Sequence, residues 1–136
     1  MRQGYIVPTL DGSATAMSTT DLRKSPVTLT ITPDGNGSAS GQMILDDGLS
    51  PNTIESKTFT SINYTFSTSS TDSTKHTLAI DPTISGYTRV SGEFPNISTI
   101  KLYGCAEITE ITLSGTGPVK AKIINDTAKK VGIIVF

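Results

Sequence analysis

The sequence predicts an all-β protein, an antiparallel β-sandwich of about eight or nine short strands. Short runs rich in β-branched residues alternate apolar with polar positions, most strictly in Val27–Thr32. Glycine and proline, 12 and 7 residues of the 136, punctuate these runs at regular spacing. Helix-favouring runs of Ala, Leu, Glu and Lys are scarce, so the composition is typical of sheets and turns.

The alternation places the strands one by one along the chain. Between them stand clusters of Gly, Pro, Asp and Ser that are typical of turns, and the segment 68–74 is a polar loop. The histidine of this region, His76, is expected to be an exposed hairpin residue. The expected strands are 5–7, closed by Pro8, then 27–32, 39–45, 57–67 (the longest), 75–80, ended by Asp81 and Pro82, 100–103, 107–113, 119–123 and 131–136.

The segment 41–50 is the stretch around which the rest is arranged. A strand with Ala39, Met43 and Leu45 on one face runs into the turn Asp46, Asp47, Gly48. Aspartate side chains accept hydrogen bonds from nearby backbone N–H groups, and glycine adopts positive φ at little cost. The three residues are therefore predicted to be a structural turn motif.

The chain is expected to divide at residue 25. Residues 1–25 read as the end of a preceding domain followed by an extended connector, because 9–25 is polar and nearly free of large hydrophobic residues. Residues 26–136 read as a single β-sandwich domain, which 136 residues suffice to build. The apolar strand 131–136 is expected to leave an exposed edge.

Two segments carry a resemblance to a known family. The strand that ends in Asp46-Asp47-Gly48, after a Pro33-Asp34-Gly35 hairpin, and the opening Arg2–Pro8 resemble, in order and spacing, the C-terminal region of glycoside hydrolase family 31. That family contains α-glucosidases of the maltase-glucoamylase, sucrase-isomaltase and acid α-glucosidase type. The pattern departs at Leu45, where an aromatic residue usually stands, and after Pro8, where Thr9-Leu10-Asp11 stands in place of a segment with a glutamine.

The resemblance implies a non-catalytic distal β-sandwich beside a proximal one. Its partners would be the catalytic barrel and the proximal sandwich of a parent glycosidase. In the family the nucleophile and the acid/base lie in the upstream barrel, and the chain has no Trp to form that family's nucleophile segment. Asp46 and Asp47, as neighbours in one turn, do not form a cleft that would hold a sugar.

Composition argues against several classes of partner. A net charge of -1 does not indicate a basic surface for binding nucleic acid or a membrane. The apolar runs are too short for membrane insertion. No cofactor or metal motif is complete: Asp34, Asn36 and Ser38 imitate the start of a calcium loop, but the later ligand positions are wrong. Cys105 reads as a structural thiol.

Asparagine usage points to a secretory route. Of the five asparagines, four lie in Asn-x-Ser/Thr sequons, where chance predicts roughly one or two. We therefore expect a secreted, lysosomal or cell-surface location as part of a longer protein, since residues 1–4 begin no signal peptide. The candidate glycan attachment residues are Asn36, Asn63, Asn96 and Asn125.

Two other functions stay open at this point. A carbohydrate-binding module for starch-type α-glucan would need exposed aromatic side chains for stacking, and Tyr87 and Tyr103 are the candidates. An adhesin-like structural sandwich would use the end 131–136 to donate or accept a strand.

Overall fold

The computed structural model describes residues 2–10, 18, 25–87, 97–104, 108, 110–114, 122–126 and 131–135. In these residues the chain forms nine strands and no helix, so the predicted all-β class is confirmed. The strands are β1 (Tyr5–Leu10), β2 (Val27–Thr32), β3 (Ser38–Leu45), β4 (Thr60–Thr68), β5 (Lys75–Ser85), β6 (Ile97–Tyr103), β7 (Glu110–Ser114), β8 (Lys122–Asp126) and β9 (Val131–Val135).

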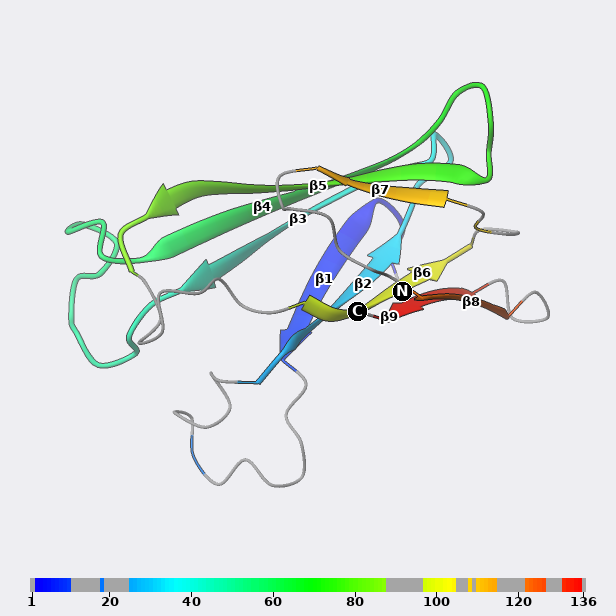
Figure 1. The fold of residues 1–136 in the computed structure, drawn as a ribbon. Helices are drawn as coiled ribbons and strands as arrows, with labels where there is room; N and C mark the ends of the chain where they lie inside the picture. Colours follow the sequence, from blue (N-terminus) through cyan, green and yellow to red (C-terminus); the bar gives the residue numbers. More distant parts are fainter. Residues whose placement is uncertain are drawn as a thin grey trace.

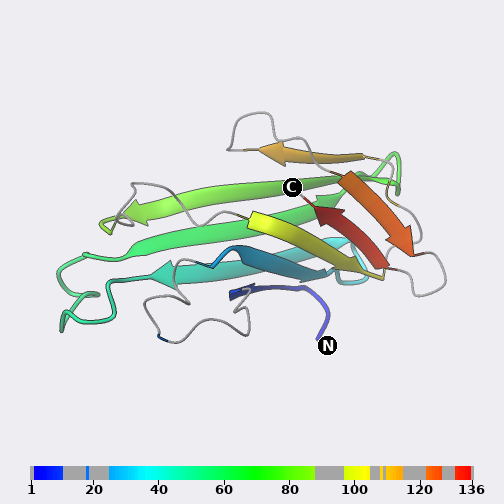
Figure 2. The same ribbon diagram turned by 60° about the horizontal axis from the view of Figure 1, so that its bottom comes forward.

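The nine strands follow one another in a single sheet in the order β7-β5-β4-β3-β1-β2-β6-β9-β8. The sheet curls so that one part faces the other, which gives a sandwich-like shape (Figures 1 and 2). We call β7, β5, β4 and β3 the β4 layer, and β1, β2, β6, β9 and β8 the β2 layer. The sheet is mixed, since β1–β3, β2–β6 and β5–β7 pair in parallel. In this respect it differs from the wholly antiparallel sandwich that the sequence predicted.

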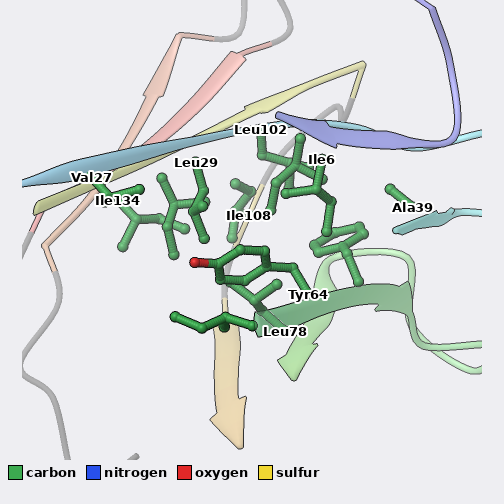
Figure 3. Packing of buried hydrophobic residues seen from close by; sticks show 13 residues of the cluster. Ile6, Val27, Leu29, Ala39, Tyr64, Leu78, Leu102, Ile108 and Ile134 are labelled. Atoms are coloured by element: carbon green, nitrogen blue, oxygen red, sulfur yellow. The ribbon is translucent and has the colours of Figure 1, made fainter. Parts of the chain in front are cut away.

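The hydrophobic core lies between the two layers. In β4 the inward residues Ile62, Tyr64 and Phe66 alternate with outward ones, as the period of two predicts. Figure 3 shows Tyr64 and Leu78 of the β4 layer facing Leu29 and its neighbours in the β2 layer. Each fully buried side chain of this size contributes roughly 1.5–3 kcal/mol to stability. The buried cluster comprises Ile6, Val27, Leu29, Ile31, Ala39, Ile62, Tyr64, Phe66, Leu78, Ile100, Leu102, Ile108 and Ile134.

The two layers meet where β1 touches β3. Tyr5 is in register with Ser40, and the Ser40 N–H donates to the carbonyl of Gly4 at 3.2 Å. Next to this contact a Cβ on Gly41 would lie 2.2 Å from the backbone oxygen of Ile6, so only glycine allows the approach. The predicted core-facing side of β3 is confirmed, because Ala39 is buried and Met43 and Leu45 pack against the core.

Two strands continue through prolines that were expected to end them. β1 runs past Pro8 to Leu10, and beyond Tyr5 it pairs only with β2, so Pro8 meets no second strand. β5 runs past Pro82, and at 11 residues it is longer than β4, which has 9. A proline lacks the N–H for a second ladder but is tolerated on an open edge or at a bulge. β7 pairs with β5 only from Lys75 to Ala79, so Pro82 lies on an open edge. The shift in the β4–β5 register between Ser61 and Ile62 also lies at Pro82, which pairs with Ile62.

The other expected boundaries differ as follows. β4 begins at Thr60 rather than at residue 57, because 51–57 is a series of turns. β9 is not an exposed edge: β6 pairs with one side of it and β8 with the other. The division of the chain at residue 25 stays a prediction. β1 pairs with β2 in the same sheet, and most of the expected connector lies outside the described residues.

Candidate functional site

The acidic turn after β3 is built by its own two carboxylates. Asp46 Oδ1 accepts from the N–H of Gly48 at 2.9 Å. Asp47 Oδ1 accepts from the N–H groups of Leu49 at 3.0 Å and Ser50 at 2.9 Å. The Ser50 hydroxyl donates to Asp47 Oδ2, and Gly48 has a φ of 62°. Three lone-pair positions of the two carboxylates are thus occupied by backbone amides of the turn itself.

Further hydrogen bonds hold the loop that follows. The Thr53 hydroxyl lies 3.5 Å from Asp46 Oδ2, and the Thr58 N–H donates to the Thr53 carbonyl at 3.0 Å. Lys57 has a φ of 54°. Its carbonyl oxygen lies so near Gly86, just after β5, that a Cβ there would be 1.8 Å away. The loop is therefore anchored both to the turn and to the end of β5.

This geometry does not suit glycoside hydrolysis. A retaining glycosidase places two carboxyl groups about 5 Å apart on either side of a sugar. Asp46 and Asp47 are adjacent in one tight turn, and their oxygens accept hydrogen bonds from that turn. The arrangement can fix a backbone conformation but offers no nucleophile and acid on opposite sides of a substrate.

The hairpin turn between β2 and β3 is closed in the same way. Asp34 Oδ1 accepts from the N–H groups of Asn36 and Ser38, both at 2.9 Å. In the part of the chain that the structure describes, no three His, Cys, Asp or Glu side chains come together as metal ligands. In the same residues, no helix is long and apolar enough to cross a membrane.

His76 is buried, which corrects the expectation of an exposed hairpin residue. It lies near the start of β5 with 2% of its surface exposed, because alternation in β5 turns it inward together with Leu78. Its ring stacks on Phe66, with centroids 5.3 Å apart. Nδ1 lies 3.2 Å from the Thr68 hydroxyl, while Nε2 is buried without a hydrogen-bond partner among the residues that the structure describes.

Burial also shifts the acidity of two groups in this layer. Desolvation lowers the pKa of His76 from its ordinary 6.5, although the nearby Asp72 carboxylate acts in the opposite direction. Desolvation raises the pKa of the Tyr64 hydroxyl to about 12. The Tyr64 hydroxyl lies 3.7 Å from the sulfur of Met43, a weak acceptor. Both groups are therefore neutral parts of the core at neutral pH.

The two tyrosines expected to stack on sugar lie far apart. Tyr103, the last residue of β6, lies beside Thr32 of β2. From Thr32 the paired residues on successive strands are Tyr5, Ser40, Thr65 and Ala79 of β5. Tyr87 follows the far end of β5, eight residues beyond Ala79, or about 26 Å along a strand. One small oligosaccharide does not span that distance.

Tyr103 instead has Tyr5 as a neighbour on the outer face of the β2 layer. Tyr5 and Tyr103 flank Thr32, about 10 Å apart across two strand spacings. Tyr5 is 45%, Val7 43% and Tyr103 37% exposed. The Arg2 guanidinium lies 5.3 Å from the centre of the Tyr5 ring. We call Tyr5, Val7 and Tyr103 the tyrosine face.

The four sequon asparagines have different positions. Asn36 is exposed in the hairpin turn between β2 and β3, and Asn63 is half-buried in the middle of β4. Asn125 is in β8, but its side chain is outside the described part of the chain. Asn96 and Cys105 also lie outside the described residues.

The chain has a curated relative that accounts for most of its length. Over 135 residues it is 35% identical to intestinal sucrase-isomaltase of Rattus norvegicus, a match that covers 96% of this chain. The same match covers only 7% of sucrase-isomaltase, so the chain corresponds to a small part of that protein. No protein-family profile matches the chain.

Solved structures agree on the fold. A glucosidase II alpha subunit superposes with a TM-score of 0.60 at 14% identity, covering 99% of this chain and 15% of the subunit. A family 31 dextranase of Flavobacterium johnsoniae gives 0.57 at 17% identity, covering 98% and 17%. The resemblance to glycoside hydrolase family 31 is confirmed. The chain matches a small part of such enzymes, and its sandwich is a fold that their much longer chains contain.

Sequence reasoning missed two features of this site. The tyrosine face needs the pairing of β1 with β2 and of β2 with β6, and no local pattern joins residue 5 to residue 103. The burial of His76 could have been found, because His76, Leu78 and Ile80 alternate on one side of the same strand. The polar loop just before His76 favoured exposure instead.

Proposed function

We propose that this chain is a non-catalytic β-sandwich domain of a family 31 α-glucosidase-like glycoside hydrolase. The observation that carries the proposal is the match to sucrase-isomaltase, which covers 96% of this chain and 7% of the relative. The carboxylates of Asp46 and Asp47, which are committed to a turn, are consistent with a role without chemistry. As part of a longer protein it would be secreted, lysosomal or held at the cell surface.

In this role the domain supports a catalytic barrel and a proximal sandwich by packing against them. The tyrosine face is the surface best suited to that contact, since Tyr and Arg are enriched at protein interfaces. Tyr5 and Tyr103 offer large, partly exposed rings on the outer side of the sheet, and Arg2 already covers one side of the Tyr5 ring. A packed neighbour would remove the exposed apolar area of Val7 from water.

A glucan-binding module has less support. The Arg2 guanidinium occupies one face of Tyr5, and Tyr87 is too distant to act with Tyr103. An adhesin-like role for residues 131–136 has less support as well, because β6 and β8 already pair with both edges of β9.

The test is an assay of the isolated chain with 4-nitrophenyl α-glucoside and with maltose. We expect no hydrolysis above the uncatalysed rate, since Asp46 and Asp47 are neighbours whose carboxylates accept hydrogen bonds from their own turn. Hydrolysis that disappears in the double variant Asp46→Asn, Asp47→Asn would contradict the proposal. The variant Glu55→Gln, an exposed carboxyl in the same loop, serves as the matched control.

A further inference from the structure

The outer face of the β4 layer is built mostly from small polar side chains in the three rows around Asn63. Alternation turns one set of residues of β3, β4 and β5 away from the core, and the register places them in rows. In the three rows around Asn63 only Asp81 is charged and no residue is large and apolar, whereas the exposed Ile44 and Lys75 lie farther along β3 and β5 on the same face. The residues of the three rows are Ser38, Ser40 and Gln42 of β3, Asn63, Thr65 and Ser67 of β4, and Thr77, Ala79 and Asp81 of β5.

Asn63 lies in the middle of this face. Its neighbours in β4, Ile62 and Tyr64, are buried in the core, so Asn63 points outward. The register places it between Gln42 and Asp81 on the adjacent strands. The side-chain amide of Asn63 forms no hydrogen bond with any residue that the structure describes.

An asparagine at this position needs an explanation. Asparagine is depleted in strands, where β-branched and aromatic residues pack better, and β4 is paired along both edges. Among the described residues no hydrogen bond of its amide stabilises the sheet, and threonine has the higher strand propensity. We therefore explain the asparagine by a group attached to its side-chain amide.

Asn63 and Thr65 form a sequon whose two functional side chains share one face. Residues two apart in a strand point the same way, about 6.6 Å from each other. Thr65 is exposed, and the neighbours across the strands are the slender Gln42 and Asp81. No aromatic or large aliphatic side chain pairs directly with Asn63 or Thr65 on the adjacent strands.

We propose that Asn63 carries an N-linked glycan, and that the outer face of the β4 layer is turned to solvent in the assembled protein. The Asn63 Nδ2 displaces the lipid diphosphate of a lipid-linked oligosaccharide donor at C1 of its first N-acetylglucosamine. The amide loses one proton, the new N–C1 bond replaces the C1–O bond, and the lipid diphosphate leaves. This proposal shares with the proposed function only the secretory location, so the glycan and the non-catalytic role can each fail alone.

The test is made on the protein purified from its natural source. Under native conditions the glycans are released with peptide-N-glycosidase in heavy-oxygen water, and tryptic peptides are then sequenced by mass spectrometry. We expect residue 63 to be read as aspartate with heavy oxygen, and release to proceed without denaturant. An unmodified Asn63, including the case in which only Asn36 is labelled, overturns the proposal, and so does release that requires unfolding.

Two variants expressed through a eukaryotic secretory pathway give a second readout. Thr65→Ala destroys the acceptor sequence while leaving Asn63 in place, so one glycan should be lost from the intact mass. Thr65→Ser keeps the sequence Asn-x-Ser and should retain that glycan, at least in part. Equal glycan mass in wild type and Thr65→Ala contradicts modification at Asn63.

Discussion

The imidazole ring of His76 lies in the core, and its Nε2 has no hydrogen-bond partner in the described part of the chain. The stacking on Phe66 and the contact of Nδ1 with the Thr68 hydroxyl suit the neutral ring. A proton on the buried Nε2 would place a cation among apolar side chains without a hydrogen-bond acceptor there. Among the described residues, the carboxylate that favours the protonated ring is Asp72, which is half-buried and whose pKa is itself lowered by the hydroxyl and the N–H of Thr74.

The stability of the chain should therefore decrease in mild acid. The folded-state pKa of His76 is below 6.5, so the unfolded chain binds more protons as the pH falls through 6.5. The contribution of the neutral His76 to the free energy of unfolding is complete above pH 6.5. It decreases as the pH falls from 6.5 to the folded-state pKa. Urea unfolding at about pH 7.5 and at about pH 5 should show a lower midpoint at the acidic pH.

The variant His76→Phe is the matched control for this prediction. It keeps an aromatic ring beside Phe66 but cannot titrate, so its unfolding midpoint should change less between the two pH values. Asp72 does not interfere, because the stabilisation from its lowered pKa is lost only at lower pH. An equal midpoint change in wild type and His76→Phe would show that the imidazole is not responsible.

Gly86 is a second residue whose environment leaves no space for a larger side chain. The substitution Gly86→Ala would put a Cβ 1.8 Å from the carbonyl oxygen of Lys57. Backbone cannot move aside as a side chain can, so we expect a loss of roughly 1–3 kcal/mol in the free energy of unfolding. Gly35→Ala, where no heavy atom lies within 4 Å of the new Cβ, should change it by less than about 0.5 kcal/mol. Similar values for the two variants would contradict the close contact.

At the scale of elements, β9 is the strand whose setting matters most for the fold. It is paired on both edges, and Ile134 is fully buried and packs into the core. The near-continuous apolar run of residues 131–136 is typical of a strand covered on both faces, and of its described side chains Ile134 is fully buried and Ile133 half-buried. The idea that it also forms an open edge was wrong, because β8 pairs with it.

Truncation of Ile134 should be costly as a consequence. Ile134→Ala removes buried methyl groups and leaves a cavity between the layers, so we expect a loss of about 2–5 kcal/mol. Ile133→Ala, the neighbour on the outer side and only half-buried, is the control and should cost clearly less. Urea unfolding measures both. Equal small effects would mean that β9 is not part of the core.

Elements with local signals could be predicted from the sequence, and those that depend on pairing could not. β2 and β3 follow from the alternation of Val27, Leu29 and Ile31 and from the glycine-rich hairpin. The continuation of β1 past Pro8 and of β5 past Pro82 depends on which edge of each strand is open. The parallel pairings of β2 with β6 and of β5 with β7 join distant segments and leave no local pattern.

The whole molecule presents two different outer faces. The β4 layer turns outward small polar residues around Asn63, whereas the β2 layer exposes the tyrosine face. The acidic turn lies at the end of β3, and its hydrogen bonds describe a structural element. The sequence could indicate the turn and the sequons, but the contrast between the faces required the order of strands in the sheet.

The central proposal is that this domain stabilises the catalytic barrel of a longer glycosidase by packing against it and takes no part in the reaction. The most direct test is the rate of thermal inactivation of α-glucosidase activity in the natural polypeptide that contains this chain. The double variant Val7→Ser, Tyr103→Ser should inactivate several-fold faster, with kcat/KM unchanged at low temperature. Ile44→Ser, an exposed isoleucine of the β4 layer, should inactivate like the wild type. An unchanged rate for the double variant, or a lower kcat/KM in the cold, would contradict the account.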